Sequence, residues 1–144
     1  MRAAIVLIAG IVWGGCNDLR DFRGDWHGKR VGEAAVVKVG MPETVEARIA
    51  IDTIDTHGLQ GSMAIDGVVA TTALASVPGA EADRLATMTF SGGPIRVYFA
   101  FAPVADGGGD AMVMVALYDD DRIELRVLRG GPRPLYGIFE MSPS

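Results

Sequence analysis

The sequence predicts an all-β domain: an antiparallel meander of about 8–10 short strands closed into a small barrel, with a β-sandwich as the alternative. Three observations predict this fold. Apolar and polar residues alternate with a period of two through most of the chain after residue 25. Turn residues, mostly Gly, Pro and Asp, separate these runs at regular spacing. Helical spacing is not sustained anywhere after the N-terminal segment.

Length, charge and cysteine count narrow the class of protein further. The chain has 144 residues, which favours one folded domain. It carries 13 Lys and Arg against 18 Asp and Glu, a net charge of −5, and this acidic balance argues against nucleic acid as a partner. One Cys and two His argue against a disulfide framework and against a Cys/His zinc site. We expect neither a metal nor a cofactor.

The N-terminus has the pattern of a secretory signal peptide. Arg2 supplies the positive charge at the start, and residues 3–13 form an uncharged, largely apolar run. Eleven residues are too few for a membrane-spanning helix, which needs about 20. The alternative interpretation is a buried first strand that ends in a turn.

The end of this segment, Gly14-Gly15-Cys16, resembles the signal of bacterial lipoproteins, which are cut just before a Cys that then carries lipid. Trp13 departs from that pattern, because Leu is usual at its position. The resemblance implies a signal peptide at 1–15, a lipidated Cys16 with a tether over 16–23, and one barrel domain over 24–144. It also implies a bacterial cell envelope location. Because Asn17 rather than Asp follows the Cys, we expect the outer membrane, facing the periplasm.

The strands follow one another with clear turn signals between them. In the second half of the chain, Ile123, Leu125 and Val127 alternate with charged residues, so one face of that segment is apolar. Asp66-Gly67 predicts a two-residue hairpin turn, since both residues tolerate a positive φ. The expected strands cover 25–31, 34–39, 44–54, 59–65, 68–76, 84–90, 95–102, 111–118, 122–129 and 134–140.

The first of these strands begins with Gly24-Asp25-Trp26, which resembles the Gly-x-Trp motif at the start of lipocalin-type barrels. In that family the Trp closes one end of the barrel and packs under an Arg from a late strand. The resemblance therefore assigns barrel closure to Trp26, with Arg122, Arg126 and Arg129 as candidates for the partner. The other interpretation is a large aromatic residue at the centre of an ordinary β core.

One strand near the C-terminus is apolar on both faces. Met112 and Met114 share one face, and Val113, Val115 and Leu117 form the other. A strand of this kind is covered on both sides or faces a partner or lipid. Residues 68–75 show the same pattern.

Few residues suggest catalysis or metal binding. His27 and His57 lack the spacing of a zinc motif, and no Gly-x-Ser-x-Gly motif is present. The acidic segments 106–110 and 119–121 match no known calcium loop, and we interpret them as acidic hairpin turns rather than calcium sites. We therefore do not expect an enzyme; catalysis by a carboxylate inside the barrel is the least favoured of three functions.

The favoured function is binding of an apolar small molecule inside the barrel, as the lipocalin resemblance implies. The alternative is a structural or assembly lipoprotein that holds an envelope protein through an outer strand face. A hollow interior favours the first, and a filled interior with an exposed apolar outer patch favours the second. The expected cavity residues are Val97, Phe99, Phe101, Ile123 and Leu125.

Overall fold

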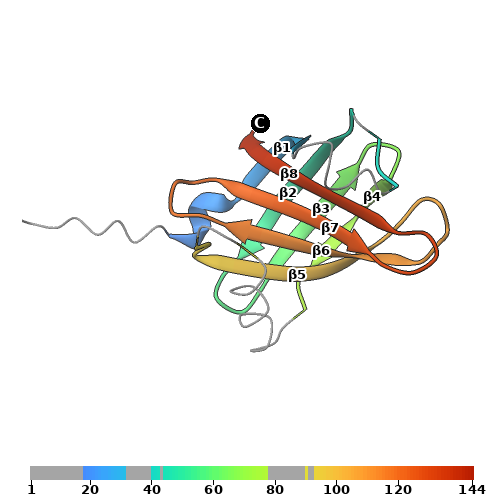
Figure 1. Cartoon of the computed structure of the whole chain (residues 1–144). Helices are drawn as coiled ribbons and strands as arrows, with labels where there is room; N and C mark the ends of the chain where they lie inside the picture. The colour runs from blue at the N-terminus through green and yellow to red at the C-terminus, as the bar shows by residue number, and fades with distance from the viewer. Residues whose placement is uncertain (1–17, 32–39, 43, 78–89, 91–92) are drawn as a thin grey trace, which may run out of the picture.

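The computed structural model describes residues 18–31, 40–42, 44–77, 90 and 93–144. These residues form one short 3₁₀ helix and eight strands (Figure 1). In chain order the elements are η1 (Leu19–Phe22), β1 (Gly24–Val31), β2 (Glu46–Ile54), β3 (Leu59–Ile65), β4 (Val69–Ala75), β5 (Arg96–Pro103), β6 (Asp110–Leu117), β7 (Ile123–Arg129) and β8 (Leu135–Pro143).

The eight strands make one antiparallel sheet in the order β4-β3-β2-β1-β8-β7-β6-β5, and the sheet curls into a nearly closed barrel. The predicted fold class is therefore confirmed. Two predicted strands, 34–39 and 84–90, lie outside the described residues, apart from Phe90, which belongs to no strand. The predicted hairpin at Asp66-Gly67 also forms, but its loop has three residues, because Ile65 pairs with Val69.

The barrel closes where β4 and β5, the two edges of the sheet, come together. The Val77 N–H donates to the Phe99 carbonyl at 2.6 Å, and the Ala105 N–H donates to the Val68 carbonyl at 2.8 Å. Pro103 lies on β5 between these two bonds and has no N–H to donate. A continuous ladder therefore cannot form along this seam, and closure rests on contacts at its two ends.

The two ends of the barrel differ. One end, which we call the η1 end, carries η1 and the turns at 55–58 and 119–121. The opposite end, the hairpin end, carries the turns at 66–68, 104–109 and 130–134 (Figure 1). Phe22 and Trp26 lie at the η1 end with ring centroids 6.2 Å apart, and the Trp26 Nε1–H donates to the Phe22 carbonyl at 3.0 Å. Trp26 is only 5% exposed, so the burial expected of it is confirmed.

Apolar side chains fill the interior. Ile49 of β2, Leu125 of β7 and Phe139 of β8 each expose 2% or less of their surface. A cavity large enough to hold water or a ligand would leave the side chains around it accessible, and these are not. The interior of an eight-stranded barrel is either filled by its inward side chains or holds one small ligand. The described interior is therefore a packed core that involves all eight strands.

We predict that Leu125→Ala lowers the free energy of unfolding by about 2–5 kcal/mol, because it opens a void in a filled core. Phe101→Ala is the matched control: this side chain is 57% exposed on a neighbouring part of the sheet, and its loss should cost less than about 1 kcal/mol. Urea melts of both variants measure the difference. Equal, small costs at the two positions would contradict a filled interior.

Candidate functional site

The five residues predicted to line a cavity do not share one face of the sheet. Ile123 and Leu125 point inward and are fully buried in the core. Val97 and Phe99 belong instead to a separate cluster on the outside of the barrel, and Phe101 is exposed. The prediction that the three β5 residues face the interior is therefore wrong.

The register explains which face of β5 is inside. Tyr98 pairs with Val115 of β6, which in turn pairs with Leu125, so Tyr98 shares the inner face with the core residues. The Tyr98 hydroxyl reaches across the η1 end and donates to the Asp55 carbonyl at 2.6 Å. The next inward residue is Ala100, whose small side chain fits an interior already filled from other strands.

None of the three arginines predicted as partners of Trp26 packs under its ring. The Arg122 guanidinium lies 4.1 Å from the centre of the Tyr118 ring, and that of Arg126 lies 4.0 Å from the Phe90 ring. Arg129 faces inward, but at the hairpin end, away from Trp26. The lipocalin-type pairing is thus not formed, although the small antiparallel barrel itself is compatible with a lipocalin-like fold.

A second apolar cluster, the outer cluster, covers part of the outside of β5 and β6. Phe90 belongs to this cluster together with Phe99 and Met114, and the Arg126 guanidinium stacks on its ring. Arg126 also pairs with Glu124, and both side chains are largely buried although they lie on the outer face. The members of the outer cluster are Phe90, Val97, Phe99, Met114, Ala116 and Tyr118, with Met112 packed at its edge.

Next to this cluster, an apolar row crosses four strands and remains exposed. Phe101 of β5 pairs with Met112 of β6, Met112 pairs with Leu128 of β7, and Leu128 pairs with Tyr136 of β8. Paired residues in antiparallel strands share a face, so the four side chains stand side by side. Phe101 is 57% and Leu128 39% exposed, and the other two are half-buried. We call this row the outer strip.

The other half of the barrel is polar on its outside. Its outward residues are mostly exposed polar and charged side chains: Asp25, His27 and Lys29 of β1, Glu46, Arg48 and Asp52 of β2, and Gln60 and Ser62 of β3. Arg48 is paired with Asp66. The apolar exposure on β5 to β8 is therefore a property of one side of the molecule rather than of the whole surface.

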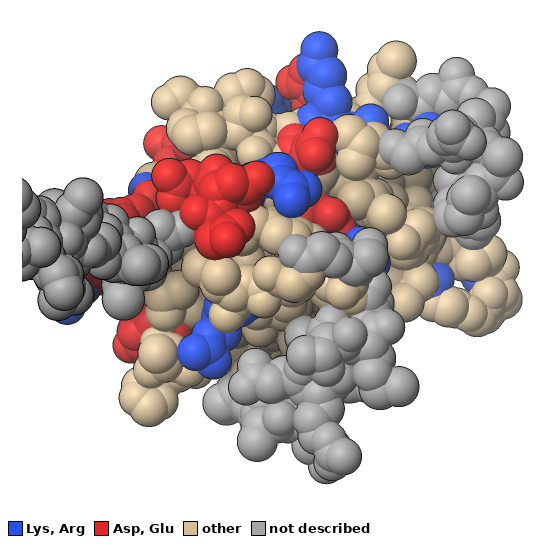
Figure 2. All heavy atoms as spheres, turned by 60° about the vertical axis from the view of Figure 1, so that its left-hand side comes forward, with Lys and Arg blue, Asp and Glu red and all other residues tan. Residues whose placement is uncertain are grey.

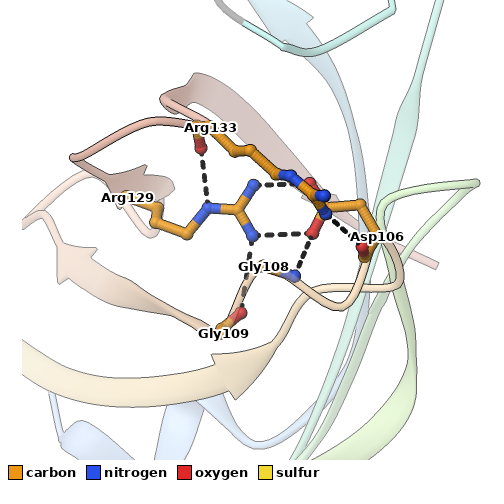
Figure 3. A network of polar contacts seen from close by, with 5 residues as sticks. All are labelled: Asp106, Gly108, Gly109, Arg129 and Arg133. Atoms are coloured by element: carbon orange, nitrogen blue, oxygen red, sulfur yellow. Dashed lines mark hydrogen bonds and ion pairs between the residues drawn. The ribbon is translucent and has the colours of Figure 1, made fainter.

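An ion pair between a buried arginine and an exposed aspartate joins two hairpins at the hairpin end (Figure 3). Arg129 donates from Nη1 to Asp106 Oδ1 at 2.8 Å and from Nη2 to Oδ2 at 2.6 Å. The Arg129 Nε–H donates to the Arg133 carbonyl, and Arg133 donates to the Asp106 carbonyl at 2.7 Å. Arg129 is only 8% exposed, and every group in the network has a partner, so the network holds the 104–109 and 130–134 turns together.

The glycines of the 107–109 loop make room for this pair. Gly107 and Gly109 have φ angles of 70° and 94°, which side-chain-bearing residues rarely adopt. A Cβ on Gly108 would lie 2.9 Å from Arg129 Nη1. The sequence pattern contained the signal for this network, because the inward alternation of β7 continues to Arg129, and a charge at an inward position needs a partner.

Asp106 is therefore held as a structural anion. Hydrogen bonds from Arg129 and from the Gly108 N–H keep the pKa of its carboxyl well below the ordinary value of 3.8. The same contact raises the pKa of Arg129. Both carboxylate oxygens of Asp106 accept hydrogen bonds from Arg129, so the carboxylate serves as the counter-charge of that arginine. The described ranges contain no cluster of three carboxylate, His or Cys residues that suits a metal.

Two pockets formed by described residues open on the outside of the barrel. A groove of about 400 Å³ lies over β2 and β3, where Ala50, Ser62 and Ala64 provide small side chains. A second pocket of about 280 Å³ surrounds the turn between the same strands, next to Asp55 and His57. The first pocket is also lined by Trp26, Ile49 and Met63 of the core, and neither pocket contains the predicted cavity residues.

The η1 end carries a high density of acidic side chains. Figure 2 brings this end forward and shows the acidic groups gathered on it, with basic side chains among them. Arg122 contacts Asp120 at 3.4 Å and Glu140 at 3.7 Å, so part of this charge is paired. Asp18 caps η1 by accepting from the Arg20 N–H.

Comparison with known protein families, with curated proteins and with solved structures finds no match to this chain. No helix within the described part of the chain is long and apolar enough to cross a membrane.

We predict that Asp106→Asn destabilises the protein at pH 7, because the buried Arg129 then loses its counter-charge. The pKa of Asp106 is lowered in the folded state, so its contribution is complete above 3.8 and declines as the pH falls below that value. The gap in unfolding free energy between wild type and variant should therefore be constant from pH 5 to 7 and narrow below about pH 4. Urea melts across this range measure it, with the exposed Asp52→Asn as control. A gap that widens in acid would contradict the assignment.

Proposed function

We propose that the chain is a lipid-anchored protein of the bacterial cell envelope that binds a protein partner through the outer strip. The observation that supports this most directly is the apolar row Phe101, Met112, Leu128 and Tyr136, whose members are exposed or half-buried on the outside of the barrel. Contiguous exposed apolar surface of this kind is typical of interaction sites. The proposal is one of binding rather than catalysis.

The lipid anchor is supported by the sequence alone, through Arg2, the apolar run and Gly14-Gly15-Cys16. One residue, Asn17, separates Cys16 from Asp18, where the described domain begins, and the two residue steps between them span at most about 7 Å. A lipid on Cys16 would therefore hold the η1 end close to the membrane surface.

This orientation places the outer strip away from the bilayer. Met112 lies toward the hairpin end of β6, whereas Leu117 ends that strand at the η1 end. About 17 Å of strand separates them at roughly 3.4 Å per residue. An apolar strip directed into the aqueous compartment favours a protein partner over the membrane of the anchor.

The packed core favours the partner hypothesis over an apolar ligand inside the barrel. Binding in the interior would require displacing side chains such as Leu125 and Phe139, which are completely buried. The outer strip needs no rearrangement to become a contact surface.

We predict that the protein made by its native cells carries lipid on Cys16 and lacks residues 1–15. Cys16→Ser should block both events, because that side chain is the acceptor for the lipid. Intact-mass measurement of the membrane-extracted protein decides this. A free thiol at residue 16 in the extracted protein would overturn the anchor and the orientation argued from it.

We predict that a photo-crosslinking amino acid at position 128 yields one discrete protein adduct in intact cells, because Leu128 is central to the outer strip. The same group at position 71, on the exposed outer side of β4, is the matched control and should yield none. Phe101→Ser should weaken the adduct from position 128 without changing the urea midpoint appreciably.

Three outcomes would contradict the partner hypothesis. They are equal labelling from positions 128 and 71, absence of any adduct from 128, and a small apolar molecule that stays bound in native mass spectrometry. The third result would restore the interior ligand hypothesis.

A further inference from the structure

The methionines of the barrel differ in their exposure to solvent. Within the described ranges, Met41, Met63, Met114 and Met141 are buried, at 7% exposure or less. Met112 is half-buried, and it is the only methionine of these ranges that solvent reaches to that extent. Its backbone pairs with β5 on one side and β7 on the other, so the accessible part belongs to its side chain.

Met112 also occupies the centre of the outer strip. Its direct neighbours are Phe101 and Leu128, the two most exposed members of the strip. Met114, two residues along the same strand face, lies beneath the outer cluster at 3% exposure. Two thioethers on one face of one strand therefore differ in access to a water-soluble oxidant.

We propose that Met112 is a site of oxidation by hydroperoxides, and that its oxidation makes the outer strip polar. The Met112 sulfur attacks the peroxide oxygen, the O–O bond breaks, and the products are methionine sulfoxide and, from hydrogen peroxide, one water. The sulfur loses two electrons, and the peroxide gains them. The greater exposure of the Met112 side chain selects it over the buried methionines.

The sulfoxide changes what the outer strip can bind. A thioether is apolar and adapts to an irregular apolar partner, whereas a sulfoxide oxygen is a strong hydrogen-bond acceptor that must stay hydrated or be paired. Placed between Phe101 and Leu128, it would interrupt the apolar row at its middle. This second step rests on the proposed function, because it concerns docking at that same strip.

The test of selective oxidation does not depend on any partner. The protein extracted from its native cells is treated with dilute hydrogen peroxide, quenched at intervals and digested, and each methionine is followed on its own peptide by mass spectrometry. We expect sulfoxide at Met112 to form at least about tenfold faster than at Met114 or Met141. Comparable rates at Met112 and Met114 would overturn the proposal.

The change in polarity is measured on the native protein by hydrophobic-interaction chromatography. Oxidised wild type should elute earlier than untreated protein, whereas Met112→Leu, which keeps the apolar volume without sulfur, should not shift. Met114→Leu is the matched control and should shift like wild type. An equal shift in the Met112→Leu variant would also overturn the proposal.

The docking step is measured with the photo-crosslinking group at position 128. Peroxide should reduce the adduct in an otherwise wild-type chain and leave it unchanged in the Met112→Leu variant. An adduct that survives complete oxidation of Met112 would refute regulation. If no adduct forms even in untreated cells, the partner hypothesis fails, and the oxidation and chromatography results decide the oxidation site by themselves.

Discussion

The limited room inside an eight-stranded barrel is the constraint on which the rest of this structure depends. The interior accepts one set of inward side chains, and residues such as Ile49, Leu125 and Phe139 already fill it. The large apolar residues of β5 therefore cannot all point inward. Val97, Phe99 and Phe101 lie on the outside, and Tyr98 and Ala100 occupy the inner face. Because successive side chains of a strand alternate between its faces, a β5 that is apolar on both faces leaves apolar side chains on the outside.

The two apolar regions on the outside are continuous but differ in cover. Phe90, stacked against the Arg126 guanidinium, belongs to a second small core together with Phe99 and Met114. The outer strip lies directly beside it, and Phe101 and Leu128 remain open to solvent. Met112 joins the two regions, because it belongs to the outer strip and packs against the outer cluster.

Different interactions stabilise the two ends of the barrel. At the η1 end, Phe22 and Trp26 close the core by apolar stacking and one hydrogen bond. At the hairpin end, Arg129 enters the inner face and is neutralised by Asp106. An inward charge is tolerated there because the loop of Gly107, Gly108 and Gly109 brings a carboxylate and backbone carbonyls to it. The two ends of the barrel are therefore closed by different kinds of contact.

The sequence by itself determined the antiparallel barrel, most strand positions, the inward set of β7 and the burial of Trp26, because period-two alternation and turn residues act locally. It also indicated that β6 is apolar on both faces. Only the tertiary structure decided which face of β5 is inside. Both faces of this strand are apolar, so the inner face is set by the register of β5 with β6. The pairing of Asp106 with Arg129 was likewise a tertiary outcome, because 23 positions separate two residues that meet only when the hairpins close.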